Sequence, residues 1–154
     1  MFANPNAPNL PDFVLFIQGV MAINPLFLPS DSPFPGYALN RARALVIRVP
    51  VCAGIEYTLA VYNCAGAILV RTTPDQAMRS TEPGSFTWLR NKYGLDKPSF
   101  GVVSSTSDEG TSVSLAVPDA LKQLTLGDLQ FLQTPWGREF LSYNQDFGGV
   151  FGIS

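Results

Sequence analysis

Apolar side chains recur at helical spacing in three stretches of the first half of the chain. The first stretch predicts a helix over 11–24, because its apolar residues stand three and four positions apart. The second predicts a helix that begins near residue 39 and ends at Pro50, since the residue before a proline is pushed out of the helical region. The third predicts a helix over about 53–71, whose small residues indicate close packing of another helix. The apolar stripe of the first helix consists of Phe13, Phe16, Ile17 and Val20.

A short helix is expected at 85–94, and Gly94 is placed to end it. After this helix the spacing of the apolar positions changes. Beyond residue 100 apolar and hydroxyl side chains alternate, and the tetrapeptide SDEG is typical of a turn. We therefore expect a β-hairpin over 98–118. An isolated hairpin is marginal in water, so we expect a neighbouring subunit or the helices to cover it. Its expected interface residues are Val102, Val103, Val113, Leu115 and Val117.

The last quarter of the chain predicts further helices over 119–146. Thr134 is placed to cap the final helix and Pro135 suits its first turn. Trp136 and Phe140 are expected to pack that helix, and Gly137 to admit another backbone close by. The tail over 147–154 is glycine-rich but too apolar to remain in water, so we expect it to dock through its apolar residues. These are Phe147, Val150, Phe151 and Ile153.

Together these patterns predict one mainly α domain. Its expected parts are an extended arm over 1–9, a helical core over 10–97, an inserted β-hairpin over 98–118, C-terminal helices over 119–146 and the apolar tail over 147–154. A chain of this length buries enough surface on folding to support one core. The predicted architecture is a small helical bundle with one hairpin and two extended arms.

The composition favours a subunit of an assembly over a free monomer. The 154-residue chain is 46% hydrophobic and only 14% charged, whereas a typical soluble domain is about 25% charged. A subunit that hides surface against neighbours needs fewer charges to stay dispersed. The net charge of −2 argues against a dedicated nucleic-acid binder, but it leaves room for a few arginines that line a DNA channel. Arg41 and Arg48, seven residues apart on one face of the second helix, are the candidates.

The sequence shows no targeting signal, and its two cysteines are not placed to form a disulfide. The first basic residue is Arg41, so no positively charged stretch precedes the apolar run 13–28 and we expect no signal peptide. Polar residues and a proline interrupt that run before it reaches the length of a membrane span. Cys52 and Cys64 are expected to lie about 18 Å apart along a helix, beyond the ~7 Å that a disulfide allows. Two free thiols are therefore expected.

The residue inventory disfavours catalysis. The chain contains no histidine, which removes the commonest general base and the commonest metal ligand. It also lacks the nucleophile elbow and the glycine-rich phosphate loops. We expect no enzyme, no metal and no cofactor. A remote alternative is a histidine-free enzyme that uses the carboxylates of Asp128 and Glu139, although a helix break is expected between them.

The order of the motifs along the chain is similar to that of a known protein family. The stretch GVVSSTSDEGTSVSL, followed by LQTPWGREFL, resembles the head–tail connector (adaptor or head-completion) proteins of tailed bacteriophages. Upstream, ALNRARALV and YTLAVYNCAGAIL are similar to the two core helices of that family. The resemblance spans residues 38–140 and leaves out the N-terminal arm and the apolar tail. The sequence departs from the family at Arg71, where the third helix often ends in a histidine.

The resemblance implies a structural virion protein in the neck of the particle, made in the cytoplasm of the bacterial host. Such proteins form a homo-oligomeric ring, commonly a dodecamer, under the portal protein. The ring extends the channel for the packaged DNA and presents a surface to tail or nozzle proteins. No membrane is involved. The alternative within virion proteins is a tail completion or capsid decoration protein, which the same hairpin and apolar tail also suit.

Two assignments stay open at the level of sequence. The tail over 147–154 docks either on the portal or a neighbouring subunit, or on the helices of its own chain. Arg41 and Arg48 either face DNA, or form ordinary ion pairs with acids such as Glu56.

Overall fold

The computed structural model of the chain describes residues 2–29, 31–75, 81–96, 105–108, 111–114 and 126–148. Within these residues the fold is mainly helical, which confirms the mainly α part of the predicted fold class. The α-helices are α1 (Leu10–Gly19), α2 (Phe34–Leu45), α3 (Ile55–Thr72), α4 (Phe86–Tyr93), α6 (Leu126–Phe131) and α7 (Pro135–Gly148). Two short 3₁₀ turns, η1 (Pro25–Phe27) and η2 (Val51–Ala53), precede α2 and α3.

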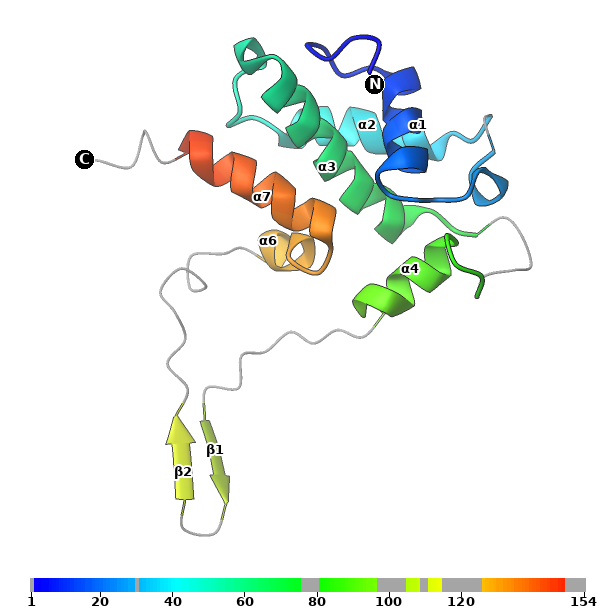
Figure 1. Cartoon of the computed structure of the whole chain (residues 1–154). Helices are drawn as coiled ribbons and strands as arrows, with labels where there is room; N and C mark the ends of the chain where they lie inside the picture. The colour runs from blue at the N-terminus through cyan, green and yellow to red at the C-terminus, as the bar shows by residue number, and fades with distance from the viewer. Residues whose placement is uncertain are drawn as a thin grey trace.

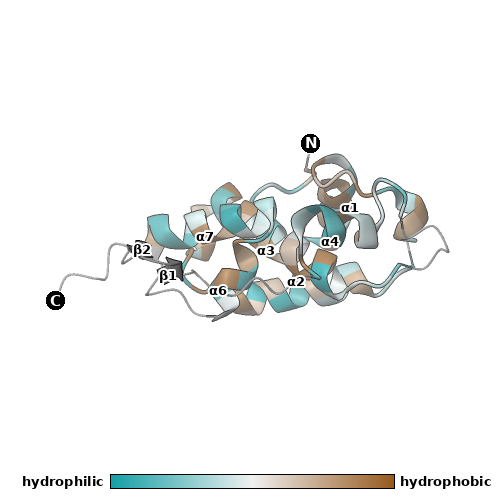
Figure 2. Ribbon diagram, turned by 90° about the horizontal axis from the view of Figure 1, so that it is seen from below, coloured by the Kyte–Doolittle hydropathy of each residue, from teal (hydrophilic) through white to brown (hydrophobic). Residues whose placement is uncertain are grey.

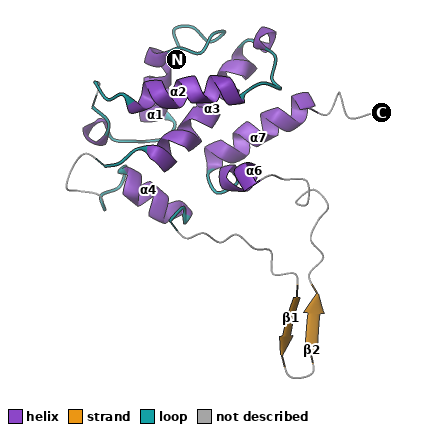
Figure 3. Ribbon diagram, turned by 180° about the vertical axis from the view of Figure 1, so that it is seen from behind, coloured by secondary structure: helices purple, strands orange, loops and turns teal. Residues whose placement is uncertain are grey.

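Helix α3 forms the centre of the bundle, and every residue from 60 to 70 is buried. Helix α7 runs beside it in the opposite direction, and α2 crosses it on another side (Figure 1, Figure 3). The small residues predicted to admit a helix include Gly66, whose nearest neighbour is the side chain of Met21. A Cβ at Gly66 would stand 2.9 Å from the Met21 sulfur, so this position makes room for a core side chain.

The corner between α6 and α7 forms as the sequence predicts. The Thr134 hydroxyl accepts a hydrogen bond from the Gly137 amide at 3.0 Å, and Pro135 opens α7. The α6 backbone passes so close that a Cβ at Gly137 would stand 2.0 Å from the Phe131 carbonyl oxygen. Trp136 and Phe140 are buried and pack edge-on against Tyr93 and Phe131, with ring centroids 5.6 and 5.1 Å apart.

The N-terminal segment is not the extended arm that its composition predicts. The Asp12 carboxylate accepts hydrogen bonds from the amides of Ala3 and Asn4, both at 2.8 Å. Asn9 caps α1 and shares two hydrogen bonds with the buried Tyr62 hydroxyl, which lies in α3. These contacts hold residues 2–9 on the helical core, because they satisfy backbone groups that a free arm would leave to water.

Helix α2 ends at Leu45, five residues before the proline that was expected to stop it. The run from Val46 to Val49 contains three β-branched residues, which lose side-chain freedom in a helix. Arg48 therefore lies outside α2, and the prediction that it shares a helical face with Arg41 is wrong. Cys52 lies in η2 and is exposed, whereas Cys64 is buried in α3, and both thiols are free.

Helix α7 reaches Gly148, so Phe147 belongs to this helix and not to a tail. The ring of Phe147 is partly buried against the core, which offsets the weak helix propensity of the glycine beside it. This corrects the expected boundary of the tail at residue 147. The remaining tail residues, Val150, Phe151 and Ile153, lie outside the described residues.

Two short strands fall inside the segment that was expected to form a hairpin. Strand β1 (Ser105–Asp108) pairs antiparallel with β2 (Thr111–Ser114), and Thr106 stands opposite Val113. The segments that join these strands to the helices lie outside the described residues, as do the expected interface residues Val102, Val103, Leu115 and Val117. The fold of the described residues is thus built from the helices, and an inserted hairpin spanning 98–118 stays a prediction.

Candidate interaction site around Arg71

The described residues offer no constellation for metal binding, since they contain no group of three His, Cys, Asp or Glu side chains that could hold an ion. Asp128 and Glu139, the carboxylates of the remote enzyme alternative, do not share a helix. Asp128 lies in α6, which ends at Phe131, and Glu139 lies in α7, which begins at Pro135. The structure therefore confirms the expected helix break between the two carboxylates.

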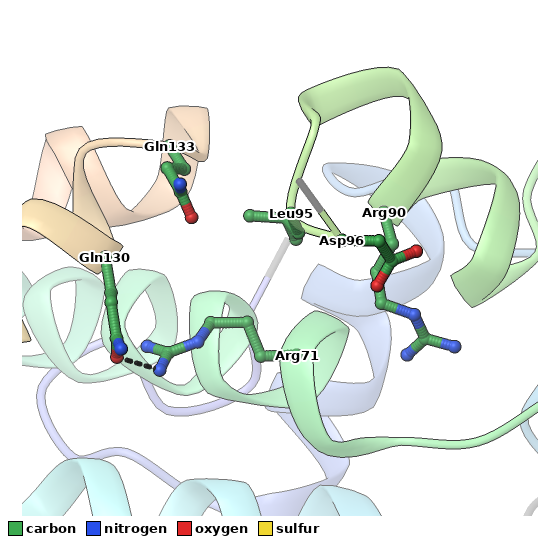
Figure 4. A pocket seen from close by; sticks show the side chains of 6 residues that line it. All are labelled: Arg71, Arg90, Leu95, Asp96, Gln130 and Gln133. Atoms are coloured by element: carbon green, nitrogen blue, oxygen red, sulfur yellow. Dashed lines mark hydrogen bonds between the residues drawn. The ribbon is translucent and has the colours of Figure 1, made fainter. Parts of the chain in front are cut away.

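Two hollows lie at the C-terminal end of α3, on either side of Arg71. One Arg71 amino group donates a hydrogen bond to the Gln130 side-chain oxygen, and its guanidinium carbon lies 5.8 Å from the centre of the Phe131 ring (Figure 4). Both partners come from α6, so two segments far apart in sequence fix this side chain. A guanidinium carries five N–H donors, and this hydrogen bond uses only one of them.

Arg41 of α2 and Arg71 line the same hollow of ≈ 350 Å³ between α2, α3 and α6. Burial lowers the pKa of Arg71, and the positive charge of Arg41 lowers it further. Arginine stays charged despite such shifts, so two cations face one space. No acidic side chain is among the described residues that line it, which also include Tyr37, Leu45, Ile68, Thr72, Gly127, Gln130 and Phe131.

A second hollow of ≈ 280 Å³ lies on the other side of Arg71, next to Arg90 and the exposed Asp96. The Arg90 guanidinium points away from Arg71 (Figure 4) and donates to the carbonyls of Val70 and Thr73 at 3.0 and 2.8 Å. These carbonyls end α3 and lack helical partners. Arg90 is thus a structural cap, whereas Arg71 uses one N–H donor for Gln130 and keeps the others for a ligand.

Three carboxylates, one from the first turn of α3 and two from α7, lie near Tyr143. Burial raises the pKa of Tyr143 in α7, and the nearby charges of Glu139, Glu56 and Asp146 raise it further. All three acidic residues are exposed. Glu56 lies in the first turn of α3, where a negative charge suits the helix dipole. In the described part of the chain Glu56 forms no ion pair with Arg41 or Arg48, so the proposed intramolecular pairing is not found.

A large share of the exposed side chains is apolar. Most residues of helix α1 are apolar (Figure 2), and Val20 at its end is 61% exposed although the pattern places it in the buried stripe. Together with the N-terminal segment, α1 borders an apolar hollow of ≈ 480 Å³. The residues that line the hollow are Phe2, Pro5, Leu15, Phe16, Gly19, Val20 and Ile55.

No helix among the described residues has the length and hydropathy needed to cross a bilayer.

Sequence reasoning did not find the arginine hollow or the apolar hollow. In the sequence Arg71 stands out only as a departure from a family pattern, and its partner Gln130 is 59 residues away. The apolar hollow depends on the folding back of residues 2–9, which composition did not predict. The one signal available was the shortage of charge, which indicates hidden surface without locating it.

Comparison of the chain with protein-family models, with curated proteins and with solved structures gave no match.

Proposed function

We propose that this chain is a structural subunit of a homo-oligomeric ring in the neck of a tailed-bacteriophage particle, seated under the portal. The observation that carries the proposal is the exposed apolar surface. Nine large apolar side chains are exposed in the described residues, at 41% to 80% of their area. Side chains such as Leu26 and Ile47, at 72% and 80%, remain in contact with water unless a partner covers them. The motif order that resembles connectors supplies the identity of the assembly.

The proposed partners are further copies of the chain, the portal protein, and tail or nozzle proteins. The hairpin 98–118 reaches an adjacent subunit, and the tail beyond Gly148 docks on the portal or a neighbour through Val150, Phe151 and Ile153. A non-enzymatic role without metal or cofactor fits the absence of histidine. The hypothesis that Arg41 and Arg48 line a DNA channel now rests on the resemblance, because the two do not share a helix.

The proposal is tested by mixing the purified chain with portal rings and measuring the bound mass. We expect a complex with one ring of subunits per portal, and loss of that complex when residues 149–154 are deleted. The deletion begins at 149 because Phe147 packs on the core as part of α7. Unchanged portal binding by the deletion variant would refute the docking role of the tail and leave the ring proposal standing.

The second candidate, a tail completion or capsid decoration protein, is favoured by the same exposed apolar side chains. Copy number separates the candidates. Quantification of this chain in purified particles is expected to give one ring per virion for a connector. Hundreds of copies per particle would instead identify a decoration protein.

A further inference from the structure

We propose that the hollow lined by Arg41 and Arg71 binds the carboxylates of Glu56, Glu139 and Asp146 on a second copy of this chain. The inference rests on the proposed self-assembly and specifies which two surfaces meet. The ligand class is a carboxylate, presented by an identical subunit.

The hollow has the chemistry of a carboxylate site. Arg71 is held in place by Gln130 and by the face of the Phe131 ring, so its remaining N–H donors are oriented before any ligand arrives. Arg41 is exposed at the same hollow and forms no ion pair with a described residue. Planar guanidinium groups match carboxylates through paired hydrogen bonds. A bound carboxylate also relieves the repulsion between the two cations.

The partner surface has the opposite charge. Glu56, Glu139 and Asp146 are close enough to Tyr143 for each charge to raise its pKa. Three negative charges near one tyrosine attract a cationic surface. The three come from the start of α3 and from α7, two helices that pack against each other, so they sit on a rigid part of the molecule.

Glu56 lies too far from Arg71 to reach it within one chain. Glu56 and Arg71 are 15 residues apart on the single helix α3, which places them roughly 22 Å apart along its axis at about 1.5 Å per residue. Contact between two different surfaces of identical subunits is head-to-tail, and it produces a ring when the rotation closes. The charge pattern therefore specifies an assembly of the kind that the proposed function requires.

Charge reversal at two exposed positions tests the contact. Arg41 takes no part in the hydrogen bond of Arg71, so Arg41→Glu changes the charge of the hollow, and Glu139→Arg changes that of the acidic surface. Each variant alone is expected to weaken self-association at least about tenfold, which corresponds to ~1.4 kcal/mol. An equimolar mixture, and the double variant, are expected to restore it. Arg48→Glu is the matched control, because Arg48 is exposed but does not line the hollow.

The readout is sedimentation of the full chain over a range of concentrations at low salt, with disulfide trapping as a second measurement. For trapping, the exposed Cys52 is replaced by serine, and the Arg41→Cys and Glu139→Cys variants are mixed. We expect a cross-link in the mixture and none in either variant alone.

The outcomes separate the inference from the proposed function. If the wild type associates and neither reversal weakens it, the inference is overturned and the ring proposal stands. If Arg41→Glu instead lowers only the salt-dependent retention of duplex DNA, the hollow binds phosphate and the inference is overturned. Association that saturates at two copies contradicts the head-to-tail arrangement. A wild type that stays monomeric alone and on portal overturns both.

Discussion

At the scale of single residues, Asp12 does the most to place the N-terminal segment. Its carboxylate accepts the Asn4 and Ala3 amides and the Asn9 side-chain amide, each at 2.8 Å. These hydrogen bonds favour the charged form and lower the pKa of Asp12 below its ordinary value. Residues 2–9 in turn supply Phe2, one wall of the apolar hollow. A single carboxylate thus connects the first residues of the chain to the surface proposed for assembly.

Replacement of Asp12 by asparagine is expected to release residues 2–9, because the amide accepts these backbone hydrogen bonds less strongly than the carboxylate. The pKa is lowered on folding, so the stabilisation is complete above the unfolded value of about 3.9 and is lost as the pH falls through the folded value. We therefore expect Asp12→Asn to be less stable than wild type at neutral pH. The difference should shrink below pH ~4.

Denaturant unfolding at pH 7 and pH 3, with amide exchange of residues 2–9, checks this prediction. Asp31→Asn is the control, because Asp31 is exposed and forms no hydrogen bond to the described residues 2–9. Equal stability of Asp12→Asn and wild type at pH 7 would show that the carboxylate does not hold the segment.

The two thiols are expected to react very differently. Burial raises the pKa of Cys64 to about 12, so little thiolate exists near neutral pH and the reagent has no access. Cys52 is exposed in η2. A thiol reagent at pH 8 should therefore modify one thiol per folded chain, with Cys52→Ser abolishing the fast reaction. Fast reaction of two thiols in the folded chain would place Cys64 outside the core.

At the scale of elements, the sequence predicts helix ends well where a local signal exists. Thr134 with Pro135 marks the start of α7, and Gly94, at φ +67°, marks the end of α4. The end of α2 was missed because apolar spacing continues past Leu45, while the backbone turns away at Val46. The exact end of α7 at Gly148 depends on core packing of Phe147, which no local signal reveals.

The α6–α7 corner should not tolerate a side chain at Gly137. A Cβ would stand 2.0 Å from the Phe131 carbonyl oxygen, so Gly137→Ala requires the two backbones to separate. Overpacking of a core costs about 1–3 kcal/mol and sometimes more, and we expect the upper end of that range in the free energy of unfolding. Because α6 carries Gln130 and Phe131, the same variant should also disturb Arg71.

Gly36→Ala is the matched control, because Gly36 lies in α2 with nothing within 4 Å of its Cβ position. Alanine is favoured over glycine in a helix by about 1 kcal/mol, so this control should be neutral or more stable. Urea unfolding of both variants provides the comparison. A Gly137→Ala variant as stable as wild type would contradict the close approach of α6 and α7.

At the scale of the whole molecule, the exposed surface combines apolar side chains with two separated charged regions. The low charge content indicated hidden surface, but its location required the structure. The apolar hollow forms from residues 2–5, α1 and the start of α3, and the arginine hollow forms from α2, α3 and α6. Neither set is contiguous in sequence, so no local pattern could assemble it.

A charge placed in the apolar hollow is expected to weaken assembly without unfolding the chain. Val20 is 61% exposed at the end of α1, so Val20→Lys should change stability by less than about 0.5 kcal/mol, as exposed substitutions usually do. It should nevertheless reduce self-association or portal binding about tenfold, because a lysine ammonium would be desolvated in the interface. Sedimentation together with urea unfolding separates the two effects.

The central claim is that the chain is a ring subunit that binds a portal. Its most direct test is the mass of the purified full chain by native mass spectrometry, alone and after mixing with portal rings. A ring subunit should give a defined complex in which one ring of subunits occupies each portal. A stable monomer in both samples, with no affinity for the portal or for itself, would contradict it.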